Sequence, residues 1–213
     1  MKVDVMVLGP ITNNTYFAIN DNNECVIVDP SYNPEKIIAK LKKDNLTLKA
    51  IILTHGHTDH IGALKGLIEE YPTVPIAIGK DDEYRLINGL PREMELVGYN
   101  KSDFTNLKAD ILAEDNDNLT FGTNLDFKVI STPGHTEGCV CYIWHNEIMF
   151  TGDTLFAGDI GRTDLKGGST PRIMKSLKKL YELDGDYDIL PGHGEASTLN
   201  SERLHNIYMR EAL

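Results

Sequence analysis

Apolar residues form two kinds of pattern along this chain: short unbroken runs, and longer segments in which they recur every three or four positions. Short runs bounded by Gly, Pro, Asn or Asp are typical of strands, whereas the periodic segments are typical of helices with one buried face. We expect strands over residues 3–8, 15–19, 25–28, 50–53, 76–78, 110–113, 125–131, 139–144, 147–150 and 188–190. We expect helices over residues 34–43, 61–70, 171–183 and 201–209.

Strands and helices follow one another in both halves of the chain, which indicates a mixed fold. Two mixed sheets packed face to face, with helices outside, would accommodate this order as a single domain over residues 1–213. Gly9-Pro10 and Asn13-Asn14 are expected to form the turns between the first two strands. Residues 80–118 are polar and weakly patterned, and we expect them to form a helix-containing excursion over one end of the fold.

Composition narrows the class of protein. The chain has 213 residues, of which 41% are hydrophobic and 25% charged, as in ordinary globular proteins. Its formal net charge of −11 disfavours nucleic acid as a partner. No apolar stretch is long enough to cross a membrane, and the N-terminal residues do not resemble a secretory signal. We therefore expect a cytoplasmic protein that acts on a small molecule, and the sequence leaves its oligomeric state open.

The three cysteines are also consistent with a cytoplasmic protein. Cys25, Cys139 and Cys141 are odd in number and too few for a disulfide framework. We interpret them as small buried residues in a reducing environment.

The segment from His55 to His60, His-Gly-His-Thr-Asp-His, is the strongest chemical signal. Three imidazoles and a carboxylate lie within six residues, between a buried strand and a helix, and these groups suit zinc, iron or manganese. His55 and His57 point the same way if strand geometry persists, while Asp59 and His60 come from the turn into the helix. One segment can therefore serve two metal ions.

Three further residues occur in the same local context. His135, Asp153 and His193 each come just after an expected strand and beside a glycine. Strand ends gather at one rim of a sheet, and glycine lets the backbone approach a shared centre. We expect seven metal ligands at this edge: His55, His57, Asp59, His60, His135, Asp153 and His193. His145 and His205 lack this context and are expected to be bystanders.

These motifs, HGHTDH, PGHT, GDTLF and PGHG, resemble the metallo-β-lactamase fold superfamily in order and spacing. The resemblance covers nearly the whole chain. It implies an α+β fold, a four-layer αββα sandwich with two divalent metal ions at one edge of the sheets. Zinc is expected first, with iron or manganese as alternatives.

The resemblance also assigns roles to individual residues. It implies that His55, His57 and His135 bind one ion, that Asp59, His60 and His193 bind the other, and that Asp153 bridges them. Asp29, at the end of an early strand, resembles a position that supports the ligands from behind.

Within the superfamily the chain looks most like the short glyoxalase II-like hydrolases (hydroxyacylglutathione hydrolase-like), and the loop GDTLFAGDIGRTDLKGG supports this. Two departures weaken the expectation of glutathione as the thiol. The chain ends 20 residues after His193, and its GRTD segment resembles the persulfide dioxygenase branch. A true β-lactamase is disfavoured, because that branch commonly places Cys at the position of Asp153.

Two reaction classes therefore remain. In the first, a metal-bound hydroxide cleaves a small acyl thioester, and no protein nucleophile is needed. In the second, an iron-dependent persulfide dioxygenase uses His55, His135 and Asp153 as a triad. A metal-stabilised structural domain is disfavoured, since seven ligands exceed the four that structural zinc needs. In either reaction Arg162 is a candidate for binding a substrate carboxylate, although Asp164 could equally neutralise it.

Overall fold

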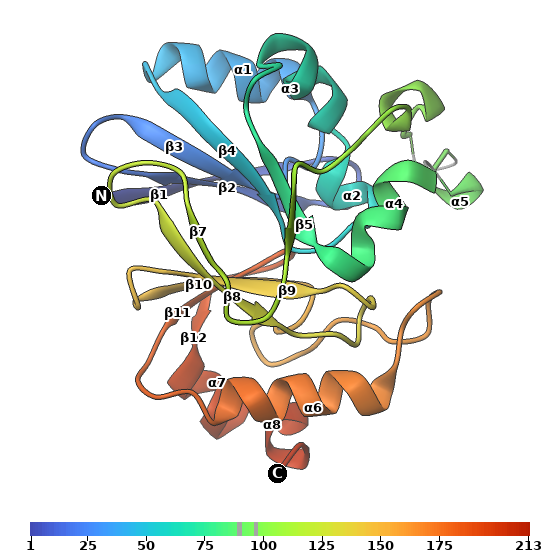
Figure 1. Cartoon of the computed structure of the whole chain (residues 1–213). Coiled ribbons are helices and arrows are strands. Elements are labelled where there is room, and N and C mark those ends of the chain that lie inside the picture. The colour runs from blue at the N-terminus through green and yellow to red at the C-terminus, as the bar shows by residue number, and fades with distance from the viewer. Residues whose placement is uncertain (89–90, 96–97) are drawn as a thin grey trace.

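The computed structural model, which describes residues 1–88, 91–95 and 98–213, has four layers (Figure 1). Two six-stranded sheets pack face to face, with one group of helices over the outer face of the first sheet and another under the second. The αββα sandwich expected for this sequence is confirmed.

Each sheet is built mainly from one half of the chain. The first sheet has the order β1 (Lys2–Leu8), β2 (Asn13–Ile19), β3 (Glu24–Val28), β4 (Thr47–Leu53), β5 (Ile76–Gly79) and β6 (Ile111–Ala113). The second has the order β12 (Ser197–Thr198), β11 (Asp188–Pro191), β10 (Ile148–Gly152), β9 (Val140–Trp144), β8 (Asp126–Ser131) and β7 (Asn118–Thr120). The strands from β3 to β6 are parallel, so their carboxyl ends meet at one edge.

The apolar runs are unbroken because the central strands are buried on both faces. In β2, Phe17 and Ile19 pack toward the outer helices, whereas Tyr16 and Ala18 pack between the sheets. A third apolar cluster, around Leu177, lies between the second sheet and its helices. The three apolar clusters between the four layers fix the positions of the strands and therefore of the loops at their ends.

The helices follow the periodic segments. Over the first sheet lie α1 (Pro34–Lys43), α2 (Thr58–Ile61) and α3 (Leu64–Glu70), and under the second lie α6 (Thr170–Tyr181), α7 (Leu199–His205) and α8 (Ile207–Glu211). Proline near the start of α1 and of α6 fixes a helical φ where no hydrogen-bond donor is needed. In α6 the apolar stripe of Ile173, Leu177 and Leu180 is fully buried.

Some local expectations were wrong. Asn13 and Asn14 belong to β2 rather than to a turn, because they pair with Val7 and Leu8 of β1. The expected helix over residues 61–70 is divided into α2 and α3, with Gly62 between them packed against the carbonyl of Ser31. The last expected helix is also divided, since the Asn206 side chain caps α8 through Tyr208 and Met209. The short strands β7 and β12 were not expected.

Residues 80–118 contain short elements at one end of the sandwich (Figure 1). These are η1 (Lys80–Asp82), α4 (Glu83–Asn88), α5 (Arg92–Glu95) and η2 (Lys101–Phe104), followed by β6 and β7. Residues 89–90 and 96–97 of the expected excursion lie outside the described residues. Within the described ranges, no helix is long and apolar enough to cross a membrane. Cys25, Cys139 and Cys141 are buried free thiols.

Candidate metal centre

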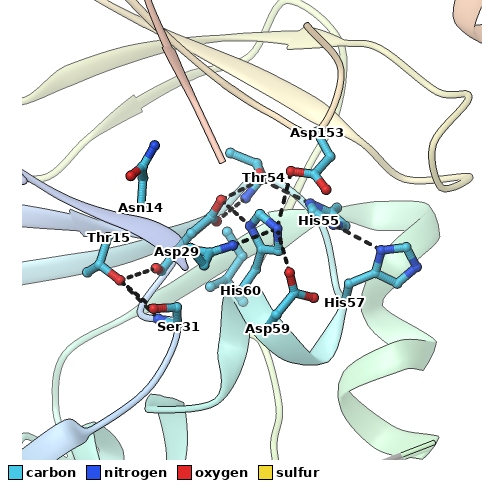
Figure 2. Close-up of polar contacts among 12 residues, drawn as sticks. Asn14, Thr15, Asp29, Ser31, Thr54, His55, His57, Asp59, His60 and Asp153 are labelled. Carbon is cyan, nitrogen blue, oxygen red and sulfur yellow. Dashed lines mark hydrogen bonds and ion pairs between the residues drawn. The ribbon is translucent and has the colours of Figure 1, made fainter. Parts of the chain in front are cut away.

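The seven expected ligands meet at one edge of the sandwich, where strand ends from both sheets converge. Figure 2 shows five of them: His55, His57, Asp59, His60 and Asp153. His55, His57, Asp59 and His60 follow β4, Asp153 follows β10, and His193 follows β11. His135 lies in the loop between β8 and β9. They form two adjoining groups, which differ in composition.

The first group consists of imidazoles only. His57 Nδ1 lies 3.1 Å from His55 Nε2 and 2.8 Å from His135 Nε2. Such a cluster can hold a cation, because all three nitrogens lie within 4.8 Å of one another.

Two of these rings are oriented by hydrogen bonds from their far nitrogens. His55 Nδ1 lies 3.1 Å from the Thr54 hydroxyl, which in turn donates to Asp29 Oδ2 at 2.6 Å. His135 Nδ1 lies 2.7 Å from the carbonyl oxygen of Arg162 and donates to it. In both rings the proton is therefore on Nδ1, and the lone pair of Nε2 faces the cluster.

The second group, formed by Asp59, His60 and His193, combines imidazoles with a carboxylate. Asp59 Oδ2 lies 3.1 Å from His193 Nε2 and 3.4 Å from His60 Nε2. His60 Nδ1 donates to Asp29 Oδ2 at 2.8 Å, which leaves its Nε2 facing the group.

Asp29, whose supporting role was expected from the family resemblance, contacts residues of this centre from behind. Its carboxylate accepts from the Thr54 backbone and hydroxyl and from His60 Nδ1 (Figure 2). Asp29, His55 and His60 also lie close enough together to be a ligand group of their own. We do not interpret them as one, because Asp29 faces the Nδ1 side of His60, opposite the nitrogen that meets Asp59 and Asp153.

Asp153 lies between the two groups. Its Oδ1 is 3.3 Å from His60 Nε2, and its Oδ2 is 3.4 Å from His135 Nε2 and 3.8 Å from His193 Nε2. Although Asp153 is buried, its Oδ1 has no hydrogen-bond partner among the described residues. A buried carboxylate oxygen without a donor is costly unless a cation compensates it. The orphaned oxygen and the converging nitrogens fit divalent metal ions.

The pKa values of the histidines shift in opposite directions in the two groups. Burial, followed by the neighbouring imidazoles, lowers the pKa of His55 and brings the pKa of His57 to about 3. Burial opposes protonation of His60 and His193 too, but contact with Asp59 and Asp153 outweighs it and raises the pKa of both. Protons therefore compete with a metal ion more strongly in the second group than in the first.

A glycine next to one ligand is required by close approach, as the sequence context indicated. Gly192 precedes His193 and packs directly on the Asp153 carboxylate and the His60 ring. A Cβ at this position would collide with both of these side chains.

The sequence analysis missed Asp82, a fully buried carboxylate that joins two ligand loops. Its Oδ2 accepts from the Gly56 backbone at 2.8 Å and from the Thr136 hydroxyl at 2.8 Å. Its Oδ1 accepts from Gly138 at 2.9 Å and from Arg85 Nε at 3.1 Å. Asp82 comes three residues after Gly79, the last residue of β5, and so lacks the adjacent glycine that marked the ligands.

The remaining candidates lie at the surface or away from the centre. Arg162 is 61% exposed and pairs with Asp164 through two contacts of 2.7 Å. His145 and His205 belong to no ligand group among residues 1–88, 91–95 and 98–213.

Comparison with known proteins identifies the family. The sequence model described as "Metallo-beta-lactamase superfamily" matches residues 8–193. The chain belongs to this superfamily. Together with the ligand groups at the sheet edge, this match supports a metal-dependent, hydrolase-like enzyme.

Two curated relatives match almost end to end. The chain is 30% identical to a protein named hydroxyacylglutathione hydrolase GloC from Haemophilus influenzae, over 98% of each chain. It is 35% identical to a probable metallo-hydrolase, YqgX, from Bacillus subtilis, also over 98% of each chain.

Two solved structures of the same superfamily are similar in fold and sequence. The structure titled BLEG-1 B3 metallo-beta-lactamase has a TM-score of 0.89 and 36% identity, covering 98% of this chain and 99% of that one. TTHA1623, crystallised in a di-iron-bound form, has a TM-score of 0.81 and 31% identity, covering 95% and 98%.

Proposed function

We propose that this protein is a dinuclear metal-dependent hydrolase that cleaves a small acyl thioester. The observation that carries the proposal is the position of Asp153, whose two carboxylate oxygens face the two ligand groups from between them. His55, His57 and His135 would hold one ion, Asp59, His60 and His193 the other, and Asp153 both. Zinc is the first candidate, and the di-iron form of TTHA1623 makes iron the second.

When bound, two such ions supply a water of lowered pKa and polarise a carbonyl group. The residues of this chain hold that chemistry in place. Asp29 and the Arg162 carbonyl keep the Nε2 lone pairs of His60 and His135 directed inward. Asp59 and Asp153 contribute negative charge, which offsets the charge of the cations in a buried site. No protein nucleophile is needed.

The thioester substrate class is supported by GloC, whose name specifies a hydroxyacylglutathione, and which this chain matches over almost its full length. Arg162 is proposed to contact a carboxylate on the substrate, with Asp164 as its partner when the substrate is absent.

The test is anaerobic turnover by protein loaded with zinc or with iron. The substrates are acyl thioesters of glutathione and of a smaller neutral thiol. We expect thiol release without dioxygen, and loss of the activity after chelation. The proposal fails if thioester turnover is absent from loaded protein while a thiol persulfide drives oxygen uptake by the iron form, which would establish the dioxygenase alternative.

One observation favours a second hydrolytic candidate. The similarity to BLEG-1, named a B3 metallo-β-lactamase, makes a β-lactam ring a possible acyl substrate of the same centre. A chromogenic β-lactam assayed beside the thioesters separates the two, because the higher kcat/KM identifies the better substrate.

A further inference from the structure

Asn13 is a buried residue at the second ligand group that has no role in the assignment above. It is the first residue of β2, and it forms an isolated β-bridge with His193. The next residue, Asn14, fastens the same loop, since its backbone donates to the Gly192 carbonyl and its side chain to the carbonyls of Pro191 and Gly194. The start of β2 is therefore fixed against the loop that carries His193.

The Asn13 carboxamide reaches the nitrogens expected to face the second ion. Its terminal Nδ2 lies 2.9 Å from His60 Nε2 and 3.5 Å from His193 Nε2. Ligand atoms about 2.1 Å from one ion lie roughly 3.0–3.4 Å apart at octahedral to tetrahedral angles. The end of the Asn13 side chain thus lies at ligand-to-ligand distance from both imidazoles.

The other end of the carboxamide lacks a partner. Asn13 is fully buried, and its Oδ1 is one of three buried side-chain nitrogen or oxygen atoms without a hydrogen-bond partner in the described part of the chain. Another of the three is Asp153 Oδ1, which lies 3.3 Å from His60 Nε2, the atom that Asn13 Nδ2 approaches. The Asp153 oxygen is consistent with a missing cation, and the Asn13 oxygen has no donor that would hold the amide in its present orientation.

A filled site changes which end of the carboxamide is favoured. The Nε2 lone pairs of His60 and His193 are committed to a bound ion, so neither can accept a hydrogen bond from Asn13 Nδ2. The oxygen and nitrogen of an amide are nearly equal in shape, and a half-turn of the group exchanges them. That half-turn places Oδ1 where Nδ2 now lies, so that an oxygen rather than an N–H donor faces the ion.

We infer that Asn13 is an additional oxygen ligand of the second metal ion. This inference rests on the proposed dinuclear site and extends it. A neutral carboxamide oxygen adds one ligand to the coordination shell of the second ion without adding charge. The second ion therefore has more ligands, and a larger share of oxygen ligands, than the first.

The experiment is a zinc titration of metal-free protein by calorimetry with a competing chelator, for wild type, Asn13→Ala and Asn13→Asp. We expect Asn13→Ala to weaken binding of one ion at least about tenfold and leave the other unchanged, as loss of a ligand would. Asn13→Asp, which retains an oxygen at the same reach, should recover or exceed wild-type affinity. Cobalt in the second site should show an altered absorption spectrum in Asn13→Ala only.

Asn20 provides the matched control. It is a buried asparagine just beyond the other end of β2, and its amide bonds Glu24 and the Thr123 carbonyl, away from the centre. Asn20→Ala should leave both zinc affinities unchanged even if it lowers the melting temperature. A weakening in Asn20→Ala equal to that in Asn13→Ala would mean a general effect of β2 and overturn the inference.

Other outcomes are equally decisive. If wild type binds two ions and Asn13→Ala binds them equally well, Asn13 is not a ligand. Reduced turnover with both affinities intact would assign Asn13 to substrate contact, which also overturns the inference. If wild type itself binds only one ion, the proposed dinuclear function fails, and this result is visible before any variant is measured.

Discussion

The two ligand groups differ in chemistry and in what holds them. The first, His55, His57 and His135, is all imidazole, and the buried Asp82 ties its two loops together. The second, Asp59, His60 and His193, contains a carboxylate and is supported by Asp29 and the start of β2. The two halves of this shared centre are therefore supported by different parts of the fold.

The largest expected effect removes the residue common to both halves. Asp153→Asn keeps the shape of the side chain but removes its charge from the buried centre. Binding of both ions should weaken by more than the ~100-fold typical of an outer-shell change, and hydrolysis should fall with it. Elemental analysis and a chelator-competition titration measure the affinities.

The controls for Asp153 are the two histidines outside the centre. His145 and His205 hydrogen-bond the carbonyls of Asn124 and Ser201, respectively, away from the ligand groups. Alanine at either position should leave metal content at the wild-type level. Loss of metal in His145→Ala alone would show that the ligand set is wrong.

The next effect should separate the halves. Asp82→Asn leaves an amide nitrogen facing donors such as the Gly56 backbone and Thr136. The two loops that carry the first group should then no longer be held in position relative to each other. One of the two ions should therefore bind roughly 10–100-fold more weakly, while binding of the other is retained. Asp81 is an exposed neighbour, and Asp81→Asn should leave both affinities unchanged. Equal weakening of both ions in Asp82→Asn would show that Asp82 acts on the fold as a whole.

The converse variant is Asp29→Asn. The Asp29 carboxylate accepts a hydrogen bond from His60 Nδ1. Without the negative charge, the tautomer and the orientation of the His60 ring are no longer fixed. The second ion should weaken by about 10–100-fold. Because Thr54 links Asp29 to His55, a smaller loss at the first ion is also expected. Cobalt spectra of the two half-loaded sites distinguish the losses, and a larger loss at the first ion would contradict this arrangement.

Acid should distinguish the halves without mutation. The pKa of His57 is about 3 and that of His55 is lowered, so these imidazoles stay neutral and able to bind metal as the pH falls. The pKa of His60 and that of His193 are raised, so protons displace metal from the second group at a higher pH. As the pH is lowered, metal content should therefore fall from two ions to one before the first group loses its ion. Simultaneous loss of both ions would mean that the groups titrate as one unit.

Much of the fold and most of the ligand set could be predicted from the sequence, because both depend on local patterns. The central strands are buried on both faces and give unbroken apolar runs, and the helix beginning near Pro171 has a regular apolar stripe. The ligands lie in short local motifs after strands. The architecture and family were therefore predicted correctly from residues close together in the chain.

What the sequence did not show depends on contacts between distant segments. Asn13 was expected in a turn because asparagine favours turns, but pairing with β1 and the bridge to His193 place it in β2. The importance of Asp82 comes from backbone donors more than 25 residues away, at Gly56 and Gly138, which no local spacing reveals. Gly62 lies between α2 and α3, where Ser31 and Tyr99 leave no room for a side chain.

The smallest expected effect concerns the exposed rim of the centre, at Arg162. The backbone of Arg162 already has a structural task, since its carbonyl accepts from His135, whereas its guanidinium is exposed and paired with Asp164. Arg162→Ala removes only the side chain, so metal content should be unchanged. If the guanidinium binds a substrate carboxylate, KM for an anionic thioester should rise by a few-fold, less than about tenfold, and kcat should stay constant. Asp164→Ala should have the opposite sign, because it frees the guanidinium and should lower KM for the same substrate. KM for a neutral thioester should be unchanged in both variants. Equal effects of Arg162→Ala on the anionic and neutral substrates would assign the side chain to the loop alone and would confine specificity to groups nearer the metal ions.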